Sequence, residues 1–149
     1  KFDLEPFTKH YTRNKKEVRK FAEDLIEKFD IRPKKADVIT QSLSGGNAQK
    51  IVIAREVDAG GDLLIAAQPT RGVDIGAIES IRTTLENVKK DGKAILLVSA
   101  DLDEVMDMSD RIVVMYEGKI TGILNAKDAT KEEVGLYMLG QAEQDRKES

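Results

Sequence analysis

Apolar side chains in the first part of the chain recur at helical spacing. Asn14 is suited to cap a helix, and the apolar residues that follow it predict an amphipathic helix ending near Phe29. A second helix is expected to open at Gly45-Gly46. The polar residues 1–13 predict a loop, and residues 33–40 predict a linker between the two helices. This part of the sequence therefore indicates a helical subdomain.

Beyond Gly60-Gly61, which we expect to end the second helix, short apolar runs alternate with helical segments. Continuous apolar runs of this length are typical of buried strands. The order of elements indicates an α/β layer that follows the helical subdomain. The expected elements are strands at 62–67 and 93–100, a helix between them capped by Asp74, a short helix at 102–108, strands at 111–116 and 119–124 joined by the two-residue loop Glu117-Gly118, and a last helix opened by the capping box of Thr130 and Glu133.

Composition excludes several classes of function. The 149 residues include 24 basic and 27 acidic side chains, a net charge of −3, which gives no electrostatic argument for binding nucleic acid. The chain has no cysteine, which rules out disulfides and cysteine-ligated metal and suits a cytosolic protein. No apolar run approaches the roughly 18 residues of a membrane span. The single histidine, His10, lies in a polar stretch and is expected to be an ordinary surface residue.

The stretch QSLSGGNAQK, from Gln41 to Lys50, carries the sharpest chemical signal. A serine followed by two glycines at the start of a helix places backbone N–H groups, a hydroxyl and the positive end of the helix dipole at one point. Glycine also lets an anion approach the backbone without meeting a Cβ atom. These features predict an anion site. Taken alone, however, the same residues are equally compatible with a flexible hinge between two helices.

The order of the motifs resembles that of the ATP-binding cassette (ABC) ATPases. LSGGNAQK is similar to their signature motif, and LLIAAQPTRGVD to the Walker B strand that runs into the D-loop. ILLVSADLDEV is similar to the strand that carries the switch histidine, and SDRIVVMYEGKI to the hairpin after it. The resemblance covers roughly residues 15–125. It implies an α/β fold of the P-loop NTPase type, of which only a part is present. Residues 1–58 would form the helical subdomain that ends in the signature, residues 59–126 part of the α/β core, and residues 127–149 a C-terminal helix and tail.

The Walker A loop, GxxxxGK followed by Ser or Thr, does not occur in the sequence. In these ATPases it precedes the signature, so we expect the chain to begin inside the cassette, as Lys1 in place of Met also suggests. The sheet should then be incomplete. Exposed apolar faces and unpaired strand edges would favour dimers or swapped elements.

Three positions depart from the family pattern. In the family that the sequence resembles, the position of Ala67 is normally Asp, which holds the magnesium shell. The position of Gln68 is normally Glu, which polarises the attacking water. The position of Ala100 is normally His, which contacts the γ-phosphate. A methyl group coordinates nothing, and an amide orients water without accepting its proton. We therefore interpret this chain's own hydrolytic site as degenerate, with no catalytic residue and no metal ligand in it.

The resemblance also implies two cassettes that face head to tail, with each ATP held between the Walker A of one and the signature of the other. This chain's signature would then close over ATP on the partner cassette. Asp74 is expected in the D-loop between the two sites, a place compatible with its capping role. The residues expected to contact that nucleotide are Leu43, Ser44, Gly45, Gly46, Asn47 and Gln49.

Within the family, SLSGGNAQK and PTRGVD resemble motifs of the importers of simple sugars and nucleosides, whose two cassettes are fused in one polypeptide. AAQPTRG resembles the corresponding stretch of the second, degenerate cassette in the nucleoside or purine branch. This likeness implies ATP and Mg²⁺, held mostly by the partner cassette, as cofactors. It implies transmembrane permease subunits as partners, an extracytoplasmic solute-binding protein as an indirect one, and a peripheral location on the cytoplasmic face of the membrane. The chain alone is expected to be inactive.

Two alternatives remain open at this stage. A soluble ABC protein of translation or DNA repair would act on nucleic acid, but such proteins need basic patches and this chain is net acidic. A catalytically dead cassette retained for assembly or regulation would make no phosphate contact through its signature. The retention of Ser44, Gly45 and Gly46 argues against this second reading.

Overall fold

The computed structural model describes residues 5–9 and 12–142. They form two compact units, which divide after Leu96. His10, predicted to be a surface residue, and residues 143–149, part of the predicted C-terminal tail, lie outside the described residues. No helix in residues 5–9 and 12–142 is long and apolar enough to cross a membrane.

The first unit opens with a short antiparallel pair of strands, β1 (Thr8–Lys9) and β2 (Thr12–Arg13). The loop predicted for residues 1–13 is therefore wrong in this part. The cause is packing: Phe7 is buried, and its ring contacts that of Phe21 edge-on at a centroid distance of 5.0 Å. The backbone N–H of Asn14 also donates to the carbonyl of Phe7 at 2.7 Å, which folds the segment back.

Two long helices and a single 3₁₀ turn make up the helical part of the first unit. They are α1 (Lys15–Lys28), η1 (Thr40–Ser42) and α2 (Gly45–Ala59). Asn14 caps α1 as predicted, by accepting from the N–H of Glu17 at 3.3 Å, and Gly60, with φ of 85°, ends α2. The small core between the helices consists of Phe29, Ile31 and Ala54.

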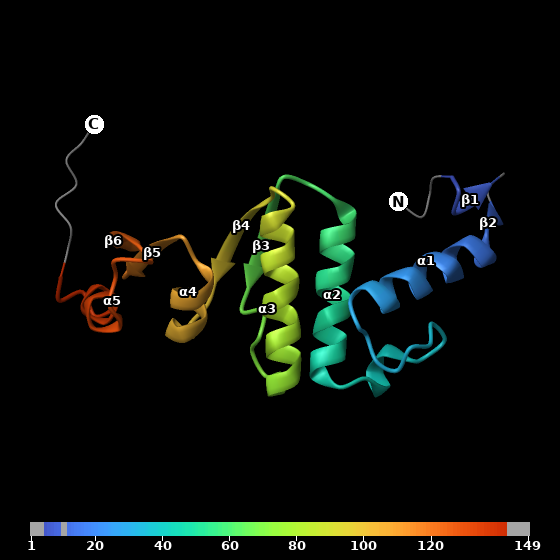
Figure 1. Ribbon diagram of the computed structural model, residues 1–149, viewed down its shortest axis with the longest axis horizontal. Helices are drawn as coiled ribbons and strands as arrows, with labels where there is room; N and C mark the ends of the chain where they lie inside the picture. The colour runs from blue at the N-terminus through green and yellow to red at the C-terminus, as the bar shows by residue number, and fades with distance from the viewer. Residues whose placement is uncertain (1–4, 10–11, 143–149) are drawn as a thin grey trace. The chain divides into compact units, whose positions relative to one another are not determined.

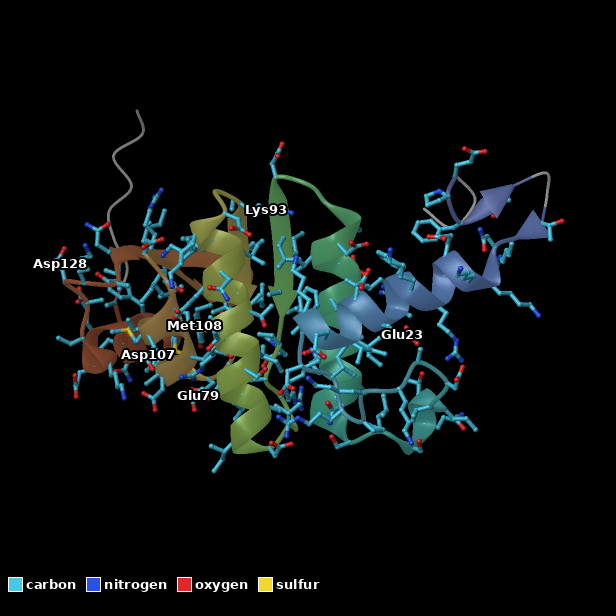
Figure 2. All side chains as sticks on the ribbon, turned by 45° about the vertical axis from the view of Figure 1, so that its right-hand side comes forward. Glu23, Glu79, Lys93, Asp107, Met108 and Asp128 are labelled. Carbon is cyan, nitrogen blue, oxygen red and sulfur yellow. The ribbon has the colours of Figure 1, made fainter. Side chains whose placement is uncertain are left out.

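The α/β part of the first unit is β3 (Leu63–Ala67), α3 (Ile75–Lys90) and the start of β4 (Ala94–Val98). Helix α3 runs beside α2 (Figure 1) and buries Ala77, Ile81, Leu85 and Val88. Charged residues such as Glu23 of α1 and Glu79 of α3 point outward (Figure 2).

The two strands expected to be buried are only partly so. In the described residues, β3 pairs only with β4, and four of their apolar side chains remain exposed. The exposed fractions are 57% for Leu63, 62% for Ile65, 51% for Leu96 and 49% for Val98. A two-stranded sheet covers little of an apolar strand, so the expected incomplete sheet with an exposed apolar face is what the structure shows.

The second unit comprises α4 (Leu102–Met108), β5 (Arg111–Tyr116), β6 (Lys119–Asn125) and α5 (Lys131–Met138). Strands β5 and β6 pair antiparallel through the predicted loop, in which Glu117 and Gly118 both have positive φ, 47° and 77°, as the type I′ turn requires. The predicted capping box also forms, since Thr130 accepts from the N–H of Glu133 at 3.1 Å. The core of this unit consists of Ile112, Val114, Leu124 and Val134.

Candidate functional site

The first turn of helix α2 presents the polar groups expected of an anion site. Ser44 is the N-cap, and its Oγ accepts from the backbone N–H of Asn47 at 3.4 Å. The first N–H groups of a helix have no partner within the helix, which leaves that of the exposed Gly45 available to a ligand. Ser44 and Gly45 are exposed. The hydroxyl, the N–H group and the helix dipole therefore converge on an accessible point.

Positions 45 and 46 favour glycine for different structural reasons. Gly46 is buried, and a Cβ atom added to it would lie 2.5 Å from the Cβ of Ala77 on α3. A Cβ atom added to Gly45 would meet only the carbonyl oxygen of Gly72, at 3.4 Å. Gly46 is thus explained by helix packing, which sequence reasoning did not anticipate. Gly45 is the glycine whose open side faces solvent and lets a ligand approach the backbone.

Asp74 lies beside this glycine pair. Its Oδ1 accepts from the N–H of Ala77 at 2.9 Å, which makes it the predicted N-cap of α3. Its other oxygen, Oδ2, would lie 3.2 Å from a Cβ atom on Gly46. The fold therefore brings Asp74 and the start of α2 together, although they are far apart in sequence.

Asn47 connects the start of α2 to the segment that follows α1. Its Nδ2 donates to Ser44 Oγ at 2.9 Å, and its Oδ1 accepts from the backbone N–H of Arg32 at 2.7 Å. Lys50, one turn further along α2, donates to the carbonyl of Asp30 at 3.0 Å. A hydrogen bond from Arg32 holds the pKa of the Asp30 carboxyl below its ordinary value. No motif marks Asp30 or Arg32, so sequence reasoning missed both.

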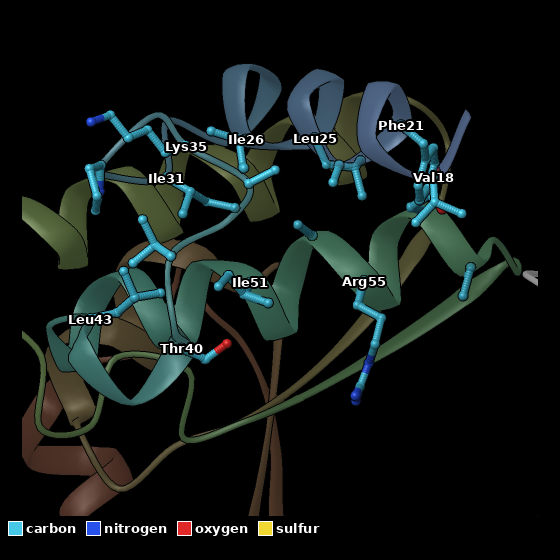
Figure 3. A pocket seen from close by; sticks show the side chains of 17 residues that line it. Val18, Phe21, Leu25, Ile26, Ile31, Lys35, Thr40, Leu43, Ile51 and Arg55 are labelled. Atoms are coloured by element: carbon cyan, nitrogen blue, oxygen red, sulfur yellow. The ribbon is translucent and has the colours of Figure 1, made fainter. Parts of the chain in front are cut away.

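Leu43 and Gln49 are less exposed than Ser44 and Gly45. The side chain of Leu43 lines an apolar cavity of about 480 Å³ between α1, the segment after it and α2 (Figure 3). Gln49 is half-buried on α2. Leu43 therefore has a packing role that needs no ligand.

The three positions predicted to be degenerate lie on other elements. Ala67 is the last residue of β3, and Gln68 follows it with φ of 50°, a left-handed conformation uncommon for a residue with a Cβ atom. Ala100 comes two residues after β4 and belongs to the second unit. Of the predicted site residues, the structure brings together the start of α2 and Asp74.

Comparison with known proteins shows the family to which this chain belongs. The chain is 45% identical over 135 residues to the nucleoside import ATP-binding protein of Lactococcus lactis subsp. cremoris, covering 91% of this chain and 27% of that protein. It is 48% identical over 126 residues to the glucose import ATP-binding protein of Haloferax volcanii, covering 83% and 23%. No protein-family model matches. A dimeric ATP-binding cassette solved in a post-hydrolysis state with ADP and Pi superposes with a TM-score of 0.67 and 25% identity, over 80% of this chain and 52% of that one. The chain is part of an ABC ATPase cassette.

This assignment confirms the expected family and the expected partial α/β fold of the P-loop NTPase type. The chain spans about a quarter of the length of the curated relatives it matches, 27% and 23% for the two above. The segment predicted to be the signature, Leu43–Asn47, spans the start of α2, and Asp74, predicted for the D-loop, caps α3. The division at residues 58 and 126 stays a prediction, as do the roles of the individual site residues.

Proposed function

We propose that this chain is the C-terminal part of the second cassette in the ATP-binding subunit of an importer for nucleosides or simple sugars. Its signature closes over ATP held by the partner cassette. The observation that carries the proposal is the first turn of α2, where exposed Ser44 and Gly45 offer a hydroxyl and a free backbone N–H group. Leu43, Gly46 and Asn47 support this turn through packing and hydrogen bonds, Gln49 follows one turn later on α2, and Asp74 lies beside Gly46.

The chain's own hydrolytic site is degenerate in this proposal. Phosphoryl transfer depends mostly on positioning and on stabilising charge, which here would need a metal ligand and a base at the end of β3. Ala67 has no ligand atom, and the amide of Gln68 accepts no proton near neutral pH. Ala100 offers no donor to a γ-phosphate. Ala67 and Ala100 carry no ligand atom, and Gln68 offers only a neutral amide oxygen in place of a carboxylate, so we expect Mg²⁺ and most of the ATP contacts to be held by the partner cassette.

The names of the relatives support the proposed substrate class and partners. One is a nucleoside importer's ATP-binding protein and another a glucose importer's. The family resemblance implies permease subunits and a solute-binding protein that delivers the solute. We propose that the chain lies on the cytoplasmic face of the membrane, bound to a permease, and that the partner cassette belongs to the same polypeptide.

Thiol labelling tests whether the signature closes over nucleotide. The chain has no cysteine, so Ser44→Cys introduces one reactive group, and Thr83→Cys, at an exposed residue of α3, is the matched control. Both are placed in a cysteine-free version of the complete importer. MgATP should slow labelling at residue 44 severalfold and leave residue 83 unchanged. Equal labelling of residue 44 with and without MgATP would contradict the proposal and favour a cassette kept only for assembly.

A further inference from the structure

The side-chain amide of Asn47 has a fixed orientation. The nitrogen and oxygen of an amide are distinguished by their partners, and a backbone N–H can only donate. The atom 2.7 Å from the N–H of Arg32 must therefore be Oδ1. It follows that the atom 2.9 Å from Ser44 Oγ is Nδ2, a donor.

This orientation determines where the Ser44 proton points. Ser44 Oγ accepts from Asn47 twice, from Nδ2 at 2.9 Å and from the backbone N–H at 3.4 Å. A hydroxyl oxygen has two acceptor sites and one proton. With both acceptor sites engaged, the O–H is left to donate away from Asn47, on the exposed side of Ser44.

The partner of Asn47 Oδ1 is itself held in place. Arg32 follows Ile31, which is buried with Phe29 and Ala54, and the N–H of Ile31 donates to the carbonyl of Ile26 at 3.0 Å. Lys50, whose side chain is only 11% exposed, holds the carbonyl of Asp30 at 3.0 Å. The N–H of Arg32 therefore comes from a backbone segment that is anchored at the two preceding residues, Asp30 and Ile31.

We propose that Asn47 is a positioning residue, which orients the Ser44 hydroxyl as a donor to a terminal phosphate oxygen of the nucleotide on the partner cassette. It acts through Ser44 and does not itself touch the phosphate. This inference rests on the proposed function of the signature. It also explains how the segment after α1 is connected to the nucleotide site, through Arg32, Asn47 and Ser44.

A double-mutant cycle in the complete importer tests the inference. Steady-state ATPase is measured for Ser44→Ala, Asn47→Ala and the double variant. Each single substitution should lower kcat/KM by about ten- to a hundredfold, the effect of losing one hydrogen bond to a charged group. In the Ser44→Ala background, Asn47→Ala should cost less than about twofold, because the group it orients is gone.

A second variant separates orientation from stability. Asn47→Asp retains an acceptor for Arg32 and, near the N-terminus of a helix, should keep the melting temperature at or above that of the parent. It presents no donor to Ser44, whose proton would turn toward the new carboxylate, so turnover should fall at least as far as in Asn47→Ala. Asn87→Asp, the same chemical change at an exposed residue of α3, is the control and should leave turnover unchanged.

The outcomes distinguish the two proposals. If Ser44→Ala leaves turnover intact, the proposed function of the signature fails. If Ser44→Ala lowers turnover but the losses of the two single variants multiply in the double variant, the signature role stands and the positioning role of Asn47 is overturned. Full turnover of Asn47→Asp would overturn it as well.

Discussion

Gly46 and Ala77 approach so closely that a Cβ atom on Gly46 would lie 2.5 Å from the Cβ of Ala77. Real Cβ atoms do not come this near, so α2 and α3 meet where only glycine fits. We expect Gly46→Ala to destabilise the chain by about 1–3 kcal/mol through overpacking. Gly45→Ala, whose Cβ would lie 3.4 Å from a single carbonyl oxygen, is the matched control and should not destabilise it. Urea denaturation measures both.

Shortening the partner side chain should repair the first variant. In Gly46→Ala with Ala77→Gly, the added methyl group occupies the space that Ala77 leaves, so part of the lost free energy of unfolding should return. Equal stability of Gly46→Ala and Gly45→Ala would show that packing against α3 does not explain this glycine.

The carboxyl of Asp30 should make a pH-dependent contribution to stability. Its pKa is lowered from the ordinary value of 3.8, chiefly by the hydrogen bond from Arg32. A depressed folded-state pKa stabilises the fold above the unfolded pKa, and this contribution disappears as the pH falls through the folded value. Asp30→Asn retains a side chain that tolerates the backbone φ of 46° and removes the charge.

The melting temperature of Asp30→Asn should therefore lie slightly below that of the parent near neutral pH, and the difference should vanish in acid. The difference stays small because the side chain of Asp30 is 47% exposed. A difference that grows on acidification would have the wrong sign and would contradict the assignment.

The exposed face of β3 and β4 should drive association of the isolated chain. Ile65 is 62% exposed and Leu96 is 51% exposed, and unpaired strand edges add to their effect. Light scattering should detect dimers, and Ile65→Lys should shift the population toward monomers. Ile75→Lys, the same change at an 84% exposed residue that opens α3, should not. A parent chain that is strictly monomeric at high concentration would contradict this expectation.

The isolated chain should not hydrolyse ATP and should bind it weakly. The sequence contains no GxxxxGK[ST] loop, which supplies most phosphate contacts in these ATPases. The first turn of α2 offers only a few donors to a solvated phosphate. Isothermal titration with MgATP tests this expectation, and a micromolar dissociation constant would mean that this chain carries a complete nucleotide site.

Local signals predicted the parts of the fold that depend on near neighbours. Asn14, Asp74 and Thr130 cap helices as expected, because the N–H that each accepts from lies three residues further on. The turn at Glu117-Gly118 likewise depends on two residues. The sequence could not reveal that Gly46 packs on Ala77, or that Asn47 bonds to Arg32, because those partners come from other elements. The apolar pattern of β3 and β4 predicted burial that a two-stranded sheet does not provide.

The central claim is that this chain contributes its signature, and not its own β3 strand, to ATP turnover. Gly45→Asp would place a Cβ atom and a negative charge against the phosphate of the partner cassette, and desolvated like charges at that range cost several kcal/mol, roughly a thousandfold in rate. Gln68→Ala removes a side chain that cannot act as a base, so we expect less than about a tenfold loss.

Steady-state ATPase and transport by the two variants in the reconstituted importer measure this difference directly. The account predicts that Gly45→Asp abolishes turnover while Gln68→Ala largely retains it. Turnover that is abolished by Gln68→Ala and intact in Gly45→Asp would contradict it, and would place the working hydrolytic site in this chain.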